Sequence, residues 1–138
     1  TVSGKTIAFL GWASKKDTND TRESAAIYVA DMLIEEQATL KVYDPKVTER
    51  QMLGDLDYLN TRNQEENSTY LLTQKDPYKA LEGAHAVAVL TEWDEFKSYN
   101  WQAIYDSMHK PAFVFDGRNI LDKQKLEKIG FVYKAIGN

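Results

Sequence analysis

Short apolar segments alternate with more polar segments along the whole 138-residue chain. Six of the apolar segments have the length of strands, and the first is nearly continuous, as expected of a strand buried on both faces. They cover residues 5–11, 39–43, 69–73, 85–91, 112–116 and 131–136. Helices are expected between them at residues 21–37, 47–56, 77–83, 101–108 and 122–129. This alternation predicts an α/β domain with a mostly parallel sheet.

The strand count also favours one topology. Six strands with a charged first crossover are typical of the Rossmann-like doubly wound sheet, with strand order 3-2-1-4-5-6 and helices on both faces. Ligands bind such sheets at the carboxyl edge, where the order reverses between the first and fourth strands. The segments expected there are residues 12–16 and Glu92–Trp93, with Arg118 beside them.

Residues 11–24 join the first strand to the first helix and are rich in charge: Gly-Trp-Ala-Ser-Lys-Lys-Asp-Thr-Asn-Asp-Thr-Arg-Glu-Ser. They include Lys15, Lys16 and Arg22, and the fold brings Arg118 to the same edge. A helix N-terminus adds partial positive charge. These cations indicate a phosphate or diphosphate ligand. The alternative is that they are solvated charges balanced by the acidic residues around them.

The local sequence predicts how this helix begins and where the chain is irregular. Asp20 is expected to be the N-cap and Glu23 to complete a capping box, which places Arg22 in the first helical turn. Asn19 is expected to form a tight turn, because Asn tolerates positive φ. Residues 57–68 are polar and without periodicity, so they are expected to be an exposed, poorly ordered loop.

A self-contained dinucleotide site is disfavoured by the glycine pattern. The fingerprint Gly-x-Gly-x-x-Gly lets the backbone approach a pyrophosphate. Here Gly11 is the only one of the three glycines present. Asp44, at the end of the second strand, occupies the position of the ribose-binding acid, but an Asp before Pro is also an ordinary turn former.

Other side chains that could carry chemistry favour structural roles. Ser14 lacks the glycine-flanked nucleophile elbow of serine hydrolases. His85 and His109 have no second ligand at metal-binding spacing, so no metal site is expected. Trp93 and Trp101 could stack on a base, but each is preferred as a core residue beside an apolar strand.

Composition excludes several classes of function. The chain has no cysteine, so it has no disulfide, thiolate metal site or cysteine nucleophile; this fits a reducing, cytoplasmic compartment. No apolar run approaches the roughly 20 residues that span a bilayer. The net charge of −4 argues against nucleic acid as a partner. A start at Thr1, with a strand following at once, suggests a domain of a longer protein.

Four segments, taken together, resemble one family. Residues 11–24 are similar to the Gly-Phe-Ala-Phe-Lys-x-Asp-Thr-x-Asp-Thr-Arg-Glu-Ser stretch of UDP-glucose 6-dehydrogenases. Val-Tyr-Asp-Pro-Lys at 42–46, Thr-Glu-Trp-Asp-Glu-Phe at 91–96 and Phe-Asp-Gly-Arg at 115–118 resemble further segments of that family, in its order and at compatible spacing. The resemblance covers essentially the whole chain.

This resemblance implies that residues 1–138 are the C-terminal UDP-binding domain of a longer enzyme. Such enzymes oxidise UDP-glucose to UDP-glucuronate, reduce two NAD⁺ to two NADH, and form a thiohemiacetal on a catalytic cysteine. The resemblance further implies that the cysteine, the main NAD site and a central helical region lie in the rest of the enzyme, which forms dimers or hexamers. The isolated domain is then expected to be inactive. Two alternatives stay open: a related dehydrogenase acting on UDP-N-acetylmannosamine or GDP-mannose, and a non-catalytic nucleotide-binding module.

The resemblance also implies roles for single residues. Lys15 matches the lysine that contacts the substrate, and Arg118 matches the arginine that reaches the UDP-sugar. Arg22 matches the arginine that reaches the NAD of the other domain. Ser14 stands beside the substrate where the family usually has Phe, so main-chain contacts are retained there and apolar packing is not.

Overall fold

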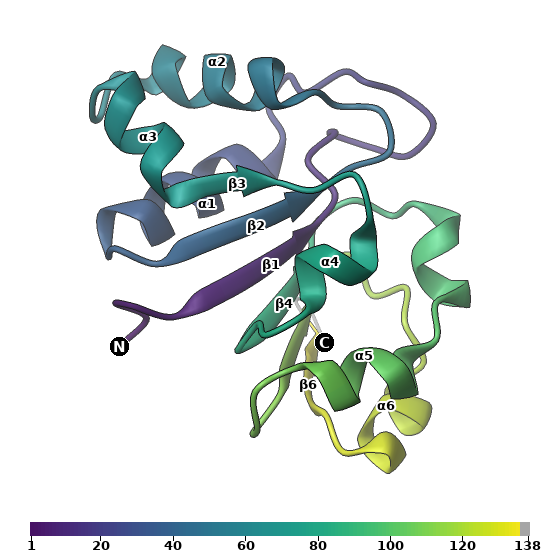
Figure 1. Cartoon of the computed structure of the whole chain (residues 1–138). Helices are drawn as coiled ribbons and strands as arrows, with labels where there is room; N and C mark the ends of the chain where they lie inside the picture. Colours follow the sequence, from purple (N-terminus) through teal and green to yellow (C-terminus); the bar gives the residue numbers. More distant parts are fainter. Residues whose placement is uncertain (136–138) are drawn as a thin grey trace.

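The computed structural model describes residues 1–135, in which six strands form one parallel sheet (Figure 1). The strands are β1 (Thr6–Leu10), β2 (Thr39–Tyr43), β3 (Leu71–Thr73), β4 (Ala86–Val89), β5 (Phe113–Asp116) and β6 (Val132–Ala135). Their order is β3-β2-β1-β4-β5-β6, which confirms the predicted topology. Ile136, the last residue of the sixth predicted strand, lies outside the described residues.

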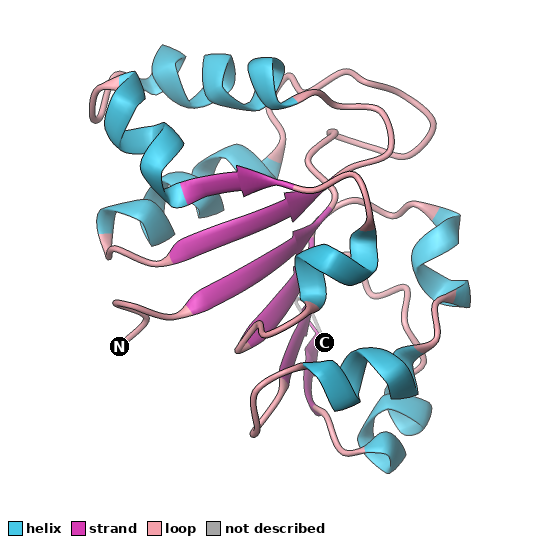
Figure 2. Ribbon diagram, viewed as in Figure 1, coloured by secondary structure: helices cyan, strands magenta, loops and turns pink. Residues whose placement is uncertain are grey.

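Helices lie on both faces of the sheet (Figure 2). They are α1 (Ala25–Glu35), α2 (Glu49–Leu59), α3 (Gln64–Tyr70), α4 (Pro77–Leu81), α5 (Trp101–Ser107) and α6 (Lys123–Ile129), with a 3₁₀ helix, η1, at Asp94–Ser98. In Figure 1, α4 lies in front of the sheet and α1 behind it. Parallel strands joined by right-handed crossovers produce this arrangement, because the chain changes face when it passes from β3 back to β4. Within residues 1–135, no helix is long and apolar enough to cross a membrane.

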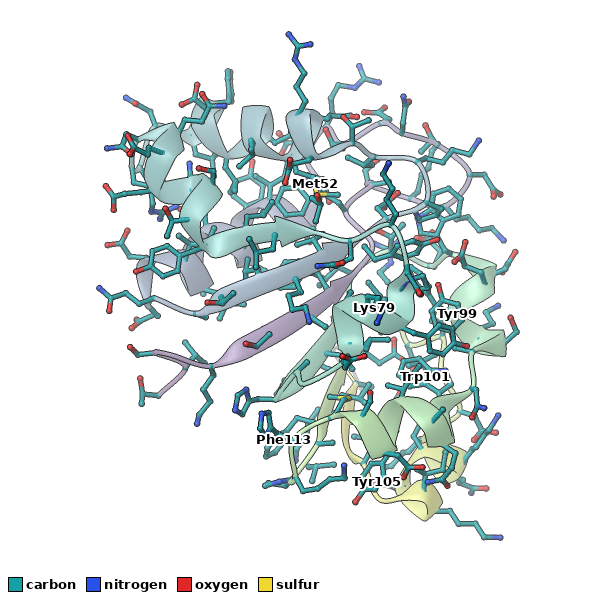
Figure 3. The ribbon with its side chains drawn as sticks, viewed as in Figure 1. Met52, Lys79, Tyr99, Trp101, Tyr105 and Phe113 are labelled. Atoms are coloured by element: carbon teal, nitrogen blue, oxygen red, sulfur yellow. The ribbon has the colours of Figure 1, made fainter. Side chains whose placement is uncertain are left out.

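The core lies between the central strands and these helices. β1 pairs with β2 on one side and β4 on the other, so its residues contact both halves of the sheet. Phe9 and Trp12 are among the largest fully buried side chains. Trp93 and Trp101 are 6% and 2% exposed, which confirms their predicted core positions. Figure 3 shows Trp101 beside Tyr99, and the two rings are 6.3 Å apart.

The prediction of a poorly ordered loop at residues 57–68 was wrong, although most of these residues are exposed, as predicted. α2 and α3 occupy most of this stretch, and Arg62 between them is only 7% exposed at its side chain. Its guanidinium donates to Asp31 Oδ1 at 2.9 Å, to Asn67 Oδ1 at 2.8 Å and to Glu35 Oε1 at 3.1 Å. The segment has no apolar periodicity because buried polar contacts to α1, rather than an apolar stripe, hold it in place.

Candidate functional site

The loop after β1 begins at a residue that must be glycine. Gly11 has φ of +99°, a region that side chains rarely adopt. An ideal Cβ there would overlap the Thr91 side chain and lie 2.7 Å from the Thr91 backbone nitrogen. Gly11 therefore lets the loop after β1 pass directly against the chain after β4, at the point where the strand order reverses.

The backbone of the next two residues is held on both sides. Trp12 N and Ala13 N donate to Asp44 Oδ2 at 2.7 and 3.0 Å. The Thr91 hydroxyl donates to Ala13 O and the Ser24 hydroxyl to Trp12 O, both at 2.6 Å. The start of the loop is thus tied to β2, β4 and α1, which fixes the position from which Ser14 and Lys15 project.

Asp44 is a structural residue rather than a free ribose-binding acid. Besides the two loop amides, its carboxylate accepts from Lys46 N at 2.8 Å and Val47 N at 3.1 Å, and from the Trp93 indole at 3.2 Å. Five N–H groups donate to this carboxylate, and the residue is only 9% exposed. The turn-forming interpretation is therefore supported, and Asp44 also links three loops of the carboxyl edge.

Helix α1 starts later than predicted. Its N-cap is Ser24, whose hydroxyl accepts from Ala26 N at 3.2 Å, so the predicted capping box of Asp20 and Glu23 was wrong. Glu23 instead has φ of +59°. Arg22 consequently lies in the loop before the helix. The predicted turn at Asn19 was also wrong, because the positive φ in this part of the loop is at Asp17, at +64°.

The structure places the four predicted cations, Lys15, Lys16, Arg22 and Arg118, at the carboxyl edge, and three of them have a carboxylate partner. Lys16 pairs with Asp94 at 3.2 Å, Arg22 with Asp20 at 2.7 Å, and Arg118 with Glu92 at 3.1 Å; all of these side chains are at least 28% exposed. Lys15 forms no ion pair with any of residues 1–135 and is exposed. Among these four cations, Lys15 is therefore the most available to an anionic ligand. Lys46 and Lys75, which follow β2 and β3, are also exposed and form no ion pair with any of residues 1–135.

The ion pairs Lys16–Asp94 and Arg22–Asp20 shift the pKa values of their members. Side-chain and backbone hydrogen bonds from Arg22 lower the pKa of Asp20 to about 2. The hydrogen bond to Asp94 raises the pKa of Lys16, and that of Asp94 falls correspondingly. All four groups are charged at neutral pH. The edge can bind and orient an anion, and within residues 1–135 it offers no base–nucleophile pair that would do chemistry.

Both hydrogen-bond donors of Ser14 are used within the loop. Its backbone N–H and its hydroxyl both donate to Asp20 O, at 2.8 and 2.9 Å. The hydroxyl oxygen keeps its acceptor capacity, and the side chain is half-buried beside Lys15. The structure thus brings Ser14 and Lys15 to the same edge as Arg118, while Arg22 is 88% exposed at its side chain and projects from the loop.

The two histidines lie away from this edge. His85 precedes β4 at the amino edge of the sheet, and its ring stacks on His109 with centroids 4.4 Å apart. His85 Nδ1 accepts from Thr6 N at 3.1 Å. Both contacts are structural and link β1, β4 and the chain after α5.

Sequence reasoning missed the residues that hold the site together. Thr91 and Ser24 were interpreted only as parts of a strand and a motif, although each binds a loop carbonyl. For Asp44, the one signal in the sequence was its place before Pro45. That signal indicated a turn, but not the hydrogen bonds from the loop after β1. Tertiary hydrogen bonds of this kind leave no periodic pattern in a sequence.

A doubly wound parallel sheet with cations at its switch point defines a Rossmann-like anion-binding domain. Residues 8–123 match the model of the UDP-glucose/GDP-mannose dehydrogenase family, UDP binding domain. The chain belongs to this family.

Curated relatives match nearly the whole chain. UDP-glucose 6-dehydrogenase 2 of Oryza sativa subsp. japonica is 48% identical, and the UDP-glucose 6-dehydrogenase of Drosophila melanogaster is 49% identical. Each match covers 99% of this chain but only 30% and 29% of the relative. The chain thus spans less than a third of the length of these relatives.

Solved structures agree with the fold. A UDP-D-ManNAc dehydrogenase from Pyrococcus horikoshii is 31% identical with a TM-score of 0.71, over 99% of this chain and 26% of that one. An NDP-N-acetyl-D-galactosaminuronic acid dehydrogenase from Methanosarcina mazei Go1 is 25% identical with a TM-score of 0.77, over 99% and 25%.

Proposed function

We propose that this chain is the UDP-binding part of an NAD-dependent UDP-glucose 6-dehydrogenase, which converts UDP-glucose and two NAD⁺ to UDP-glucuronate and two NADH. Over 99% of its length, the chain is 48–49% identical in sequence to curated UDP-glucose 6-dehydrogenases, which supports this activity for the longer polypeptide. The observation that carries the binding role is Lys15, an exposed cation without an ion-pair partner among residues 1–135, on a loop whose backbone is fixed.

Within this proposal, each cation has a separate role. Lys15 contacts the diphosphate of the UDP-sugar, and Arg118 reaches it from the end of β5. Ser14 lies beside the sugar nucleotide and contributes through its main chain and hydroxyl oxygen. Arg22 is exposed and its guanidinium can fork onto phosphate oxygens, so it contacts a cofactor that approaches from outside the domain.

The residues described do not form a complete NAD site. Side chains stand at two of the three fingerprint glycine positions, and one of them, Ala13, is fully buried. The Asp44 carboxylate is already bound by five N–H groups. The cofactor would therefore be held mainly by another part of the polypeptide, with Arg22 as this chain's contribution. Alone, the chain is expected to bind UDP and to catalyse nothing.

A related nucleotide-sugar dehydrogenase is the second candidate. It is favoured by the 31% identity to a UDP-D-ManNAc dehydrogenase, whose fold is shared over 99% of this chain. The proposed UDP contacts are the same in both cases, because they involve the nucleotide and not the sugar. Assays of the longer enzyme on UDP-glucose and UDP-N-acetylmannosamine separate the two.

Isothermal titration with UDP tests the binding role. Lys15→Ala should weaken binding roughly ten-fold or more, because it removes a charge-assisted contact to the diphosphate. Lys128→Ala removes the same charge from α6, remote from the site, and serves as the matched control. Equal affinity of the wild type and Lys15→Ala would show that UDP, if bound, is bound elsewhere.

A further inference from the structure

Glu92, directly beyond β4, has a carboxylate with unused acceptor capacity. It accepts no hydrogen bond from residues 1–135, and its Oε1 is buried. Arg118 Nη2 lies 3.1 Å from Oε1, but no N–H is aligned on that oxygen, so the contact is electrostatic. The side chain is 28% exposed, and its exposed surface belongs to atoms other than Oε1. A carboxylate has about four acceptor positions, and here the protein fills none of them.

Four other carboxylates, which lie beyond β2 and β4 or at the end of β5, all accept hydrogen bonds. Five N–H groups surround Asp44. Asp94 accepts from Lys16 and Lys97, and Glu95 accepts from the hydroxyls of two tyrosines. Asp116 accepts from the Tyr133 hydroxyl at 2.9 Å and from Leu121 N at 2.8 Å. In this group of five, Glu92 is the carboxylate that is left for a ligand.

Rossmann-like domains commonly bind a ribose hydroxyl with an acid at the end of the second strand. In this chain that acid is Asp44, and the loop amides occupy it. Glu92 lies on the other side of β1, at the switch point between β1 and β4, where the ligand is expected. Its neighbour Arg118 supplies a cation for phosphate at the same place, so an acceptor for a sugar hydroxyl and a donor for phosphate stand side by side.

We propose that Glu92 accepts a hydrogen bond from the ribose 2′-hydroxyl of the bound nucleotide and thereby selects ribonucleotides over 2′-deoxyribonucleotides. This inference rests on the proposed UDP-binding function. Arg118 holds the Oε1 side of the carboxylate by charge and leaves Oε2 to the ligand. A 2′-deoxyribonucleotide would cover the carboxylate without offering it a hydrogen-bond donor. Binding sites discriminate strongly against a ligand that leaves a polar group of the site unpaired in this way.

Titrations with UDP and 2′-deoxy-UDP test the inference. The wild-type chain should bind UDP roughly ten-fold or more tightly than 2′-deoxy-UDP, the effect of one hydrogen bond to a charged group. Glu92→Ala should bring the two dissociation constants within about three-fold of each other, because no charged acceptor is left. Asp94→Ala is the matched control. It removes a carboxylate from the same loop, one that pairs with Lys16 and Lys97, and it should keep the wild-type ratio of the two dissociation constants.

The outcomes separate this inference from the proposed function. A wild-type chain that binds UDP and 2′-deoxy-UDP equally, or a Glu92→Ala chain that keeps the wild-type ratio, overturns the role of Glu92 and leaves UDP binding intact. A wild-type chain that does not bind UDP overturns both. UDP-glucose is a third ligand. If Glu92→Ala lowers the affinity for UDP-glucose and leaves the affinities for UDP and 2′-deoxy-UDP unchanged, the carboxylate contacts the hexose, and the proposed contact with the ribose is wrong.

Discussion

Gly11 shows how closely two loops approach at the candidate site. Two separate features require glycine at this position. Its φ is positive, and Thr91 occupies the space that a Cβ would need. The Thr91 hydroxyl also donates to Ala13 O, so Thr91 cannot move away without losing that hydrogen bond. A side chain at Gly11 would therefore disturb both the fold and the loop that presents Lys15.

Gly11→Ala should lower the free energy of unfolding by about 2–4 kcal/mol, through backbone strain and overlap with Thr91. Urea denaturation measures the change. Gly83→Ala is the matched control, because Gly83 has φ of +74° and a Cβ added to it would meet nothing within 4 Å. In the control, only the backbone strain should lower the free energy of unfolding, by about 1–2 kcal/mol. Similar losses in both variants would mean that Thr91 yields easily and that the close approach is unimportant.

At the level of elements, polar contacts between helices add to the apolar packing of α2 against the core. Arg62 joins the turn between α2 and α3 to α1, with contacts to both a side chain and the backbone of Asp31. Charged groups that are removed from water in this way are costly to leave without partners.

Arg62→Ala should lower the free energy of unfolding by about 2–4 kcal/mol, because the half-buried Asp31 loses its charged partner and keeps only the Thr61 hydroxyl. Arg50→Ala, which removes an exposed arginine from α2, should change it by less than about 0.5 kcal/mol. Chemical denaturation of the two variants gives the comparison. Equal, small effects would mean that α2 and α3 are held by other contacts.

The amino edge of the sheet should make stability depend on pH. Burial, with smaller effects of His109 and Lys5, lowers the pKa of His85 below its usual 6.5. The neutral ring is the form that accepts from Thr6 N. A lowered pKa in the folded state means that this stabilisation is complete above about pH 6.5 and is lost as the pH falls through the folded pKa. The unfolding free energy should therefore decline on acidification below neutrality.

Denaturation curves between about pH 8 and pH 5 measure this decline, and His85→Gln should flatten it because Gln does not titrate. Carboxylates contribute equally to both proteins at the acid end of this range. A slope that is unchanged in His85→Gln would assign the pH dependence to other groups.

The sequence predicted elements better than it predicted contacts. Strand order followed from the alternation of strands and helices, and all six strands were located. Two local predictions failed for one reason. Ser24 rather than Asp20 caps α1 because its hydroxyl also reaches Trp12 O, and Arg62 orders the stretch at 57–68 because Asp31 of α1 lies beside it. Both causes are contacts between residues distant in sequence, which local patterns do not contain.

For the whole molecule, the arrangement of charge matters more than its sum. The net charge is −4, yet the cations from the β1–α1 loop and the end of β5 meet at one edge. Acidic neighbours neutralise Lys16, Arg22 and Arg118 and hold them in place. Of these four cations, Lys15 is the one that forms no ion pair within residues 1–135. This arrangement supports the proposal that an anion binds at the carboxyl edge. The chain spans less than a third of the length of its curated relatives.

An NMR titration of the isotopically labelled chain with UDP tests this central claim most directly. The backbone signals of residues 11–15 and 117–119 should shift, and Lys15→Ala should reduce these shifts at the same UDP concentration. Signals around His85, at the opposite edge of the sheet, should stay in place and serve as the internal control. Shifts centred away from the carboxyl edge, or no shifts at all in the wild-type chain, would contradict the assignment of this edge as a UDP-binding site.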